Sequence, residues 1–186
     1  MKAVSFTRME DGTKEEYLFL DQFYGNNHEQ VVDNALTLLK QMAGDPLGYQ
    51  VDRYTHSLQT ATRALRDGAD EETIVCALLH DVGDVLAPYN HSQVAAAMLR
   101  PYVSEKNHWV VAHHGLFQGY YFFHHFDMDR NARDQYRDHP YYQDCIDFCH
   151  RWDQASFDPE YDTMSLGEFE PMVRRVFSRE PTKFVE

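Results

Sequence analysis

The sequence has little cysteine, and what it has forms no recognisable framework. Its three cysteines are Cys76, Cys145 and Cys149, which leave an odd number and contain no CxxC pair. This argues against a set of structural disulfides and against a cysteine-based zinc site. We interpret all three as small residues of the core.

Long apolar runs are also missing. No run reaches the ~18 residues that suggest a membrane-spanning helix, and the first residues lack the apolar stretch of a secretory signal. We therefore expect no membrane partner and a cytoplasmic location.

Positive charge is scarce. Seventeen Lys and Arg stand against thirty Asp and Glu, which gives a formal net charge of -13. Such a chain is repelled by polyanions, so we expect no nucleic-acid partner. The hydrophobic fraction of 43% and the charged fraction of 25% are those of an ordinary globular domain. We therefore predict one domain over residues 1–186.

Alternating strand patterns, internal repeats and flexible linkers are nearly absent, whereas apolar residues recur at helical spacing. We predict helices over residues 29–42, 51–65, 70–81, 92–99, 104–114 and 140–157. Asp70 and Ser104 are predicted N-caps, and Gly68 is expected just past a helix end. We expect a partly helical segment at 115–139 and an irregular N-terminal arm, 1–28, on the bundle. The fold class is therefore all-α.

Histidine and aromatic residues are what the chain has in excess, with eleven His, twelve Tyr and twelve Phe. Candidate metal ligands lie on separate predicted helices: His56, His80, Asp81, His91, one of His113 and His114, and Asp153. Imidazole and carboxylate are the ligands that borderline transition metals prefer. This set would hold two ions if Asp81 bridges them.

The order of these residues along the chain is similar to that of a known family. A histidine, then ALLHDVGD, then the aspartate of HRWDQ form the series H…HD…D. This series resembles the HD-domain superfamily of metal-dependent phosphohydrolases, which are all-α. The resemblance covers roughly residues 49–157, which are then the metal-binding core of an HD-domain helical bundle.

Two further histidines resemble a dinuclear branch of that superfamily. His91 in NHSQVAAAML and one histidine of VVAHHG fall where that branch binds its second metal. We prefer His114 to His113 because its spacing after Ser104 and Val111 is similar to that of the family. The resemblance then implies two iron ions that share Asp81. One ion takes His56, His80 and Asp153, and the other takes His91 and His114.

This branch includes phosphonate-cleaving oxygenases and, more distantly, myo-inositol oxygenase, which use an Fe(II)/Fe(III) pair and dioxygen. The resemblance implies that the substrate is an organophosphonate similar to 1-hydroxy-2-(trimethylammonio)ethylphosphonate. Its carbon–phosphorus bond would break to release phosphate and a carboxylate such as glycine betaine. Asp81 is the expected bridge, and Tyr49 or Tyr24 is expected to cap the open iron position until substrate binds.

Substrate contacts are predicted from charge and from aromatic content. Rings of the segment HWVVAHHGLFQGYYFFHHF can hold a quaternary cation through cation–π contacts, and Asp84 would add a negative charge. Gln118 stands where the relatives carry a lysine that binds the anion. The predicted substrate-binding residues are Asp84, Gln118, Tyr120, Tyr121, Arg133, Arg137 and His113.

Two other functions remain open. The same ligands could hold hard divalent ions and activate water, as in a phosphohydrolase acting on a nucleotide or another phosphate ester. A sensor domain that binds metal without catalysis is a third possibility. The histidine-rich ligand set favours iron over magnesium.

Overall fold

The computed structural model describes residues 3–24 and 28–182, and in these residues it contains helices and no strand. The all-α prediction is therefore confirmed. The α-helices are α1 (Lys14–Tyr24), α2 (His28–Gln41), α3 (Arg53–Arg66), α4 (Glu71–Leu79), α5 (His91–Leu99), α6 (Glu105–Phe122), α7 (Tyr142–Arg151) and α8 (Leu166–Phe177). Short 3-10 helices are η1 (Met9–Asp11), η2 (Val82–Val85), η3 (Pro88–Asn90), η4 (Phe123–Phe126), η5 (Ala132–Tyr136) and η6 (Asp153–Ala155).

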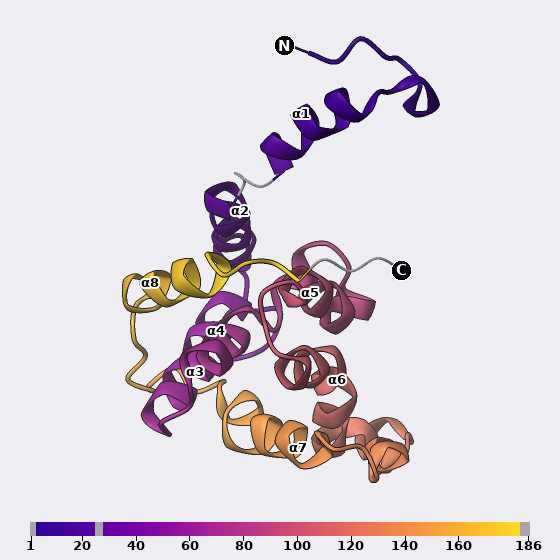
Figure 1. The fold of residues 1–186 in the computed structure, drawn as a ribbon. Coiled ribbons are helices and arrows are strands. Elements are labelled where there is room, and N and C mark those ends of the chain that lie inside the picture. Colours follow the sequence, from indigo (N-terminus) through magenta and orange to yellow (C-terminus); the bar gives the residue numbers. More distant parts are fainter. Residues whose placement is uncertain (1–2, 25–27, 183–186) are drawn as a thin grey trace.

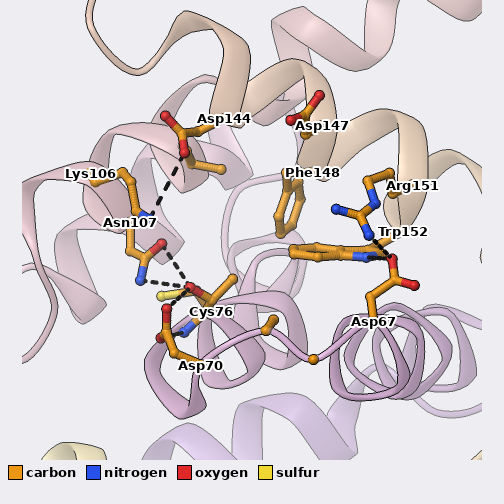
Figure 2. A pocket seen from close by; sticks show the side chains of 14 residues that line it. Asp67, Asp70, Cys76, Lys106, Asn107, Asp144, Asp147, Phe148, Arg151 and Trp152 are labelled. Atoms are coloured by element: carbon orange, nitrogen blue, oxygen red, sulfur yellow. Dashed lines mark hydrogen bonds and ion pairs between the residues drawn. The ribbon is translucent and has the colours of Figure 1, made fainter.

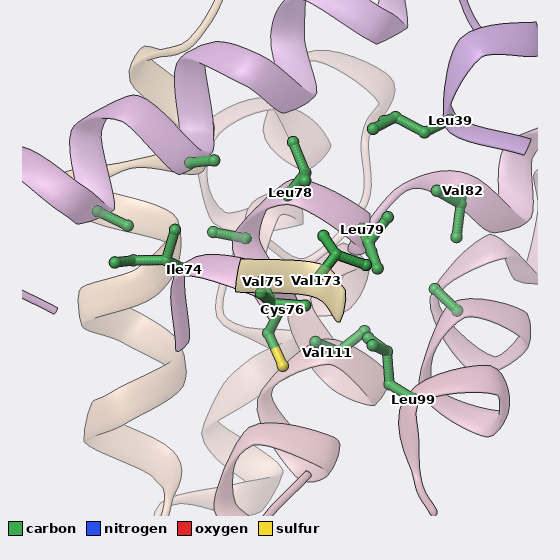
Figure 3. Packing of buried hydrophobic residues seen from close by; sticks show 14 of the residues in the cluster. Leu39, Ile74, Val75, Cys76, Leu78, Leu79, Val82, Leu99, Val111 and Val173 are labelled. Carbon is green, nitrogen blue, oxygen red and sulfur yellow. The ribbon is translucent and has the colours of Figure 1, made fainter. Parts of the chain in front are cut away.

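Helix α4 forms the centre of the bundle. It is apolar on nearly all sides, and every residue from 74 to 79 is buried. Such a helix is stable only when other helices surround it, and α3, α6 and α8 all pack against α4. Figure 3 shows Leu79 of α4 near Leu99 of α5, Val111 of α6 and Val173 of α8. The helix ends directly before His80 and Asp81, so this packed core fixes their position.

The helix boundaries next to the site follow from local capping. Asp52 accepts a hydrogen bond from the backbone N–H of Thr55 at the start of α3, and Asp70 does the same for Thr73 at the start of α4. Gly68 has a φ of +76° in the turn between them, a conformation that glycine adopts without a steric penalty. The predicted N-caps Asp70 and Ser104 and the predicted helix stop at Gly68 are confirmed.

Two predicted helices were wrong in extent, and a third helix was missed. Helix α6 continues to Phe122 instead of ending near His114, because its aromatic residues keep packing on α7 and η5. Helix α7 ends at Arg151, and a separate 3-10 turn carries Asp153. Helix α8 was not predicted at all, although Ser165 and Glu168 form a capping box at its start. Gly167 and Pro171 obscure its helical pattern in the sequence.

The N-terminal segment also differs from the prediction of an irregular arm lying on the bundle. It contains η1 and the three-turn helix α1, and Figure 1 shows α1 (indigo) standing away from helices α3–α8. None of the helices in the described part of the chain is long and apolar enough to cross a membrane.

Candidate metal centre

The predicted ligands come from five segments that meet at one end of α4. His80 and Asp81 follow that helix directly, and Asp153 opens η6. The remaining histidines lie inside α3, at the first position of α5 and inside α6: His56, His91 and His114. All of these side chains except that of His91 are buried. The fold thus gathers residues that are far apart in the sequence.

Asp81 lies between two pairs of histidines. Its Oδ2 is 3.4 Å from Nε2 of His56 and 3.5 Å from Nε2 of His80. Its Oδ1 is 3.2 Å from Nε2 of His114 and 3.4 Å from Nε2 of His91. The two oxygens of one carboxylate therefore face different histidine pairs, which is the placement of a bridging ligand.

Asp153 completes the first pair and leaves one oxygen without a partner. Its Oδ1 is 3.2 Å from Nε2 of His56 and 3.7 Å from Nε2 of His80. Its Oδ2 is buried and accepts no hydrogen bond. A buried acceptor without a partner costs roughly 1–3 kcal/mol, and a cation at this position would remove that cost.

The histidines are oriented through their other ring nitrogen. Nδ1 of each ring lies 2.7–2.9 Å from a backbone carbonyl, so it donates its N–H there. The carbonyls belong to Ser156, Ala77, Pro88 and Val111. In neutral rings the Nε2 lone pairs are then free to bind a metal, which is the usual arrangement around metal-bound histidines.

The spacing of these nitrogens also fits cations. Nε2 of His56 is 3.2 Å from Nε2 of His80, and Nε2 of His91 is 3.3 Å from Nε2 of His114. Two lone pairs cannot hydrogen-bond to each other, so each close pair needs a proton or a metal ion between its members. Together with the unpartnered oxygen of Asp153, this donor set fits two metal ions.

The charged groups of the cluster shift one another's pKa values. Burial acts to lower the pKa of His80, but the carboxylates of Asp81 and Asp153 outweigh it and raise that pKa to about 9. Burial acts to raise the pKa of both aspartates, but the neighbouring histidines hold these pKa values well below the usual range. A metal ion bound by His80 would replace the proton that this side chain otherwise carries.

The two adjacent histidines of α6 have different surroundings. His114 belongs to the cluster, whereas Nδ1 of His113 lies 2.8 Å from the carbonyl of Trp109. The ring of His113 stacks on the indole of Trp109 at 4.1 Å, and Tyr136 packs edge-on against it. His113 therefore lies outside the cluster, and also outside the cavity where it was expected to contact substrate.

A cavity of about 300 Å³, called the metal cavity below, opens onto the cluster. Asp81, His91, His114 and Asp153 form its metal-facing wall, and three other predicted residues, Tyr49, Gln118 and Tyr121, also line it. The remaining lining residues are Arg53, Gly115, Phe122, Gln154 and Phe157. The cavity thus joins the candidate metal ligands to aromatic rings, two amides and one arginine.

Four further predicted substrate contacts lie outside this cavity: Asp84, Tyr120, Arg133 and Arg137. The ring of Tyr120 is covered by the guanidinium of Arg133 at 3.8 Å. Arg137 is exposed and pairs with Asp134 at 2.7 Å. Asp84 borders a neighbouring cavity of about 390 Å³. None of these four side chains lines the cavity that opens onto the cluster.

Asp84 has partners that the sequence did not indicate. Its Oδ1 is 3.2 Å from Nδ1 of His91, and its Oδ2 is 3.3 Å from Nε of Arg53. Each carboxylate oxygen therefore lies next to a candidate ligand or an arginine. Asp84 is placed to orient His91 and Arg53, and it does not line the cavity that opens onto the cluster.

Arg53 and Phe157 line the cavity but were not predicted from the sequence as site residues. Arg53 stands three residues before His56 on α3, and this spacing places both on the same side of the helix. The Phe157 ring stacks on His56 at 4.4 Å and on Tyr49 at 5.0 Å. The i, i+3 spacing could have revealed Arg53, whereas Phe157 follows η6 in a loop that has no sequence periodicity.

A second cavity, of about 260 Å³, is lined by Phe148, Trp152 and several polar residues (Figure 2). Its acidic residues already have partners: Asp67 accepts from Nε1 of Trp152 at 2.7 Å and pairs with Arg151 at 2.9 Å. Among the described residues, every group of three or more potential ligands within reach of one ion comes from the cluster around Asp81. The metal cavity is therefore the candidate site.

Comparison with known families gives one match. Residues 53–151 match the family described as HD domain, which is more than half of the chain. The matched stretch contains five of the clustered residues, and Asp153 follows two residues beyond it. No curated protein matches the chain. HD domains are typically enzymes that depend on divalent metals. The family match and the His/Asp cluster agree, and the chain belongs to the HD-domain family.

Proposed function

We propose that this HD-domain protein is a mixed-valent di-iron oxygenase. Its proposed substrate is of the 1-hydroxy-2-(trimethylammonio)ethylphosphonate type, cleaved at the carbon–phosphorus bond to phosphate and a carboxylate such as glycine betaine. The observation that carries the proposal is the position of Asp81, whose two oxygens face two separate histidine pairs. This supports a dinuclear site over a mononuclear one.

The donor set supports iron. Four imidazoles and two carboxylates suit a borderline transition metal better than magnesium, which prefers oxygen ligands and water. When bound, the iron pair would activate dioxygen and return to its starting oxidation state, while the C–H and C–P bonds of the substrate supply the four electrons that reduce dioxygen, so no separate organic cofactor is needed. Asp81 would hold both ions, while the backbone carbonyls at Nδ1 keep the histidine rings aligned.

The lining of the cavity supports a substrate with a quaternary cation. A trimethylammonium group cannot donate hydrogen bonds, so its recognition depends on ring faces and packing. Tyr121, Phe122 and Phe157 supply such rings, and Tyr49 lies at the same cavity. Because Asp84 does not line this cavity and pairs with Arg53, we assign the cation to the rings. Tyr49 is the proposed cap of the open iron position.

Gln118 supports a substrate that also carries a hydrogen-bond donor. Its Oε1 is buried and has no partner, and its side chain borders the cavity. A substrate hydroxyl could donate to this oxygen and remove the cost of leaving it unpaired. A hydroxyphosphonate has such a group on the carbon that reacts.

Hydrolysis of a phosphate ester is the alternative. Membership of the HD-domain family favours it, since the same ligands can hold two divalent ions that activate water. The two reactions differ in their need for dioxygen, and that difference separates them.

The test is turnover of the hydroxyphosphonate by iron-loaded protein, with phosphate release and dioxygen consumption measured together. We expect one dioxygen consumed per phosphate released and no turnover under strict anaerobiosis. We also expect a higher kcat/KM for the trimethylated substrate than for the primary amine, because the cavity offers rings. Equal turnover without dioxygen would establish hydrolysis instead.

A further inference from the structure

We infer that Arg53 binds the anionic group of the substrate in the metal cavity. The inference extends the proposed function, and rests on it in that a phosphonate or phosphate must reach this cavity. It does not depend on whether the reaction is oxidative or hydrolytic.

The placement of Arg53 follows from the start of α3. Asp52 caps this helix, so Arg53 is its first residue and lies about one turn before His56. Its side chain is 29% exposed and borders both the metal cavity and the neighbouring cavity that contains Asp84. Arg53 is therefore open to a ligand but held beside the cluster.

The contacts of Arg53 hold the guanidinium without saturating it. Nη1 is 3.4 Å from Oδ2 of Asp81, and Nε is 3.3 Å from Oδ2 of Asp84. Both distances are longer than the roughly 2.7–2.9 Å of a strong charge-assisted hydrogen bond. The guanidinium also lies over the ring of Tyr49, 5.1 Å from its centroid. A group with five N–H donors keeps capacity for an anion after these contacts.

The charge of the metal-loaded cavity also favours an anionic ligand. Among the described lining residues, Arg53 is the single lysine or arginine. Two divalent ions would carry more positive charge than Asp81, Asp153 and Asp84 together offset. With Arg53 added, the loaded cavity attracts anions.

The planar shape of the Arg53 guanidinium favours an oxyanion over other anions. Metal ions held by Asp81 would compete with Arg53 for this carboxylate, which would leave N–H groups of Arg53 available to another acceptor. The planar fork of a guanidinium matches two oxygens of a phosphonate or phosphate. Asp84 and Tyr49 hold this fork beside the cluster.

The test measures binding of methylphosphonate to metal-loaded protein by calorimetry under anaerobic conditions, together with metal content. Methylphosphonate has the anion but lacks the reacting hydroxyl carbon, so it binds without turnover. We expect R53Q and R53M to keep both metals and to bind methylphosphonate at least about ten-fold more weakly, as for loss of a charged hydrogen bond. R53K should lie between these variants and the wild type.

The matched control is R66Q, at the other end of the same helix, where Arg66 pairs with Asp162 at 2.8 Å. It should bind methylphosphonate as the wild type does. Wild-type affinity in a metal-loaded R53Q or R53M variant would overturn the inference. Loss of metal in both neutral variants would also overturn it, since Arg53 would then serve to support Asp81. If the wild type shows no oxygen-dependent turnover but binds methylphosphonate in an Arg53-dependent way, only the proposed oxygenase reaction is rejected.

Discussion

At the scale of single residues, the adjacent histidines His113 and His114 have different roles. Successive residues of an α-helix point about 100° apart, so His113 and His114 face different surroundings. His114 lies 3.2 Å from Asp81, whereas His113 stacks on Trp109 in an aromatic cluster. One histidine is thus available to a metal and the other packs the helix against η5.

This difference predicts opposite effects of two alanine substitutions. His114→Ala removes a donor beside Oδ1 of Asp81, so we expect the protein to retain about one ion in place of two. His113→Ala should keep both ions and lower the free energy of unfolding by ~1 kcal/mol through the lost aromatic contact. Metal analysis and urea unfolding measure the two effects. Equal metal loss in both variants would contradict the assignment.

At the scale of elements, the site depends on how closely the segment after α4 approaches the start of α5. A Cβ added to Gly83 would lie 2.1 Å from the carbonyl oxygen of His91, far inside van der Waals contact. On α6, a Cβ at Gly115 would lie 2.8 Å from Oγ of Ser92. Glycine is needed at both positions because backbone and side chains of the neighbouring helix occupy the space.

We therefore expect Gly83→Ala to displace the start of α5, and His91 with it. The free energy of unfolding should fall by ~1–3 kcal/mol, as for other overpacked sites, and the ion next to His91 should bind more weakly. The control is Gly167→Ala in α8, where the nearest atom would be 3.8 Å away. Alanine there should raise stability by ~0.5–1 kcal/mol because it favours the helix. A stable Gly83→Ala protein with full metal content would refute this account.

At the scale of the whole molecule, the metal centre is a tertiary crosslink. Its ligands belong to α3, the end of α4, α5, α6 and η6, so bound ions would tie together most of the bundle. Without them, imidazole nitrogens and carboxylates remain packed in the interior with one carboxylate oxygen unpaired. Stability should consequently depend on metal.

Removal of metal with a chelator should lower the melting temperature. Free metal at ~100 times its Kd stabilises by about 2.7 kcal/mol, which for a chain of this size corresponds to roughly 5–10 °C. Calorimetry with and without chelator measures the shift, and added iron should reverse it. Asp81→Ala should melt at the same temperature with and without chelator, since the shared ligand is gone. A chelator-insensitive wild type would argue against a metal-linked fold.

The sequence by itself determined the helical class, most helix positions and the set of residues that cluster. Helical periodicity and caps such as Asp70 and Ser104 act over a few residues, so they are readable locally. The order of His56, His80, Asp81 and Asp153 was also readable, because it resembles a known family pattern. Helix α8 escaped prediction, since Gly167 and Pro171 interrupt a period that packing against α4 sustains.

Only the tertiary structure decided how these side chains face one another. It placed His114, which the sequence pattern favoured, beside Asp81 and packed His113 against Trp109, and it brought Asp84 next to His91 and Arg53. It also directed Arg133 and Arg137 away from the metal cavity. These outcomes depend on helix rotation and on contacts between segments far apart in the sequence, and no local pattern encodes either.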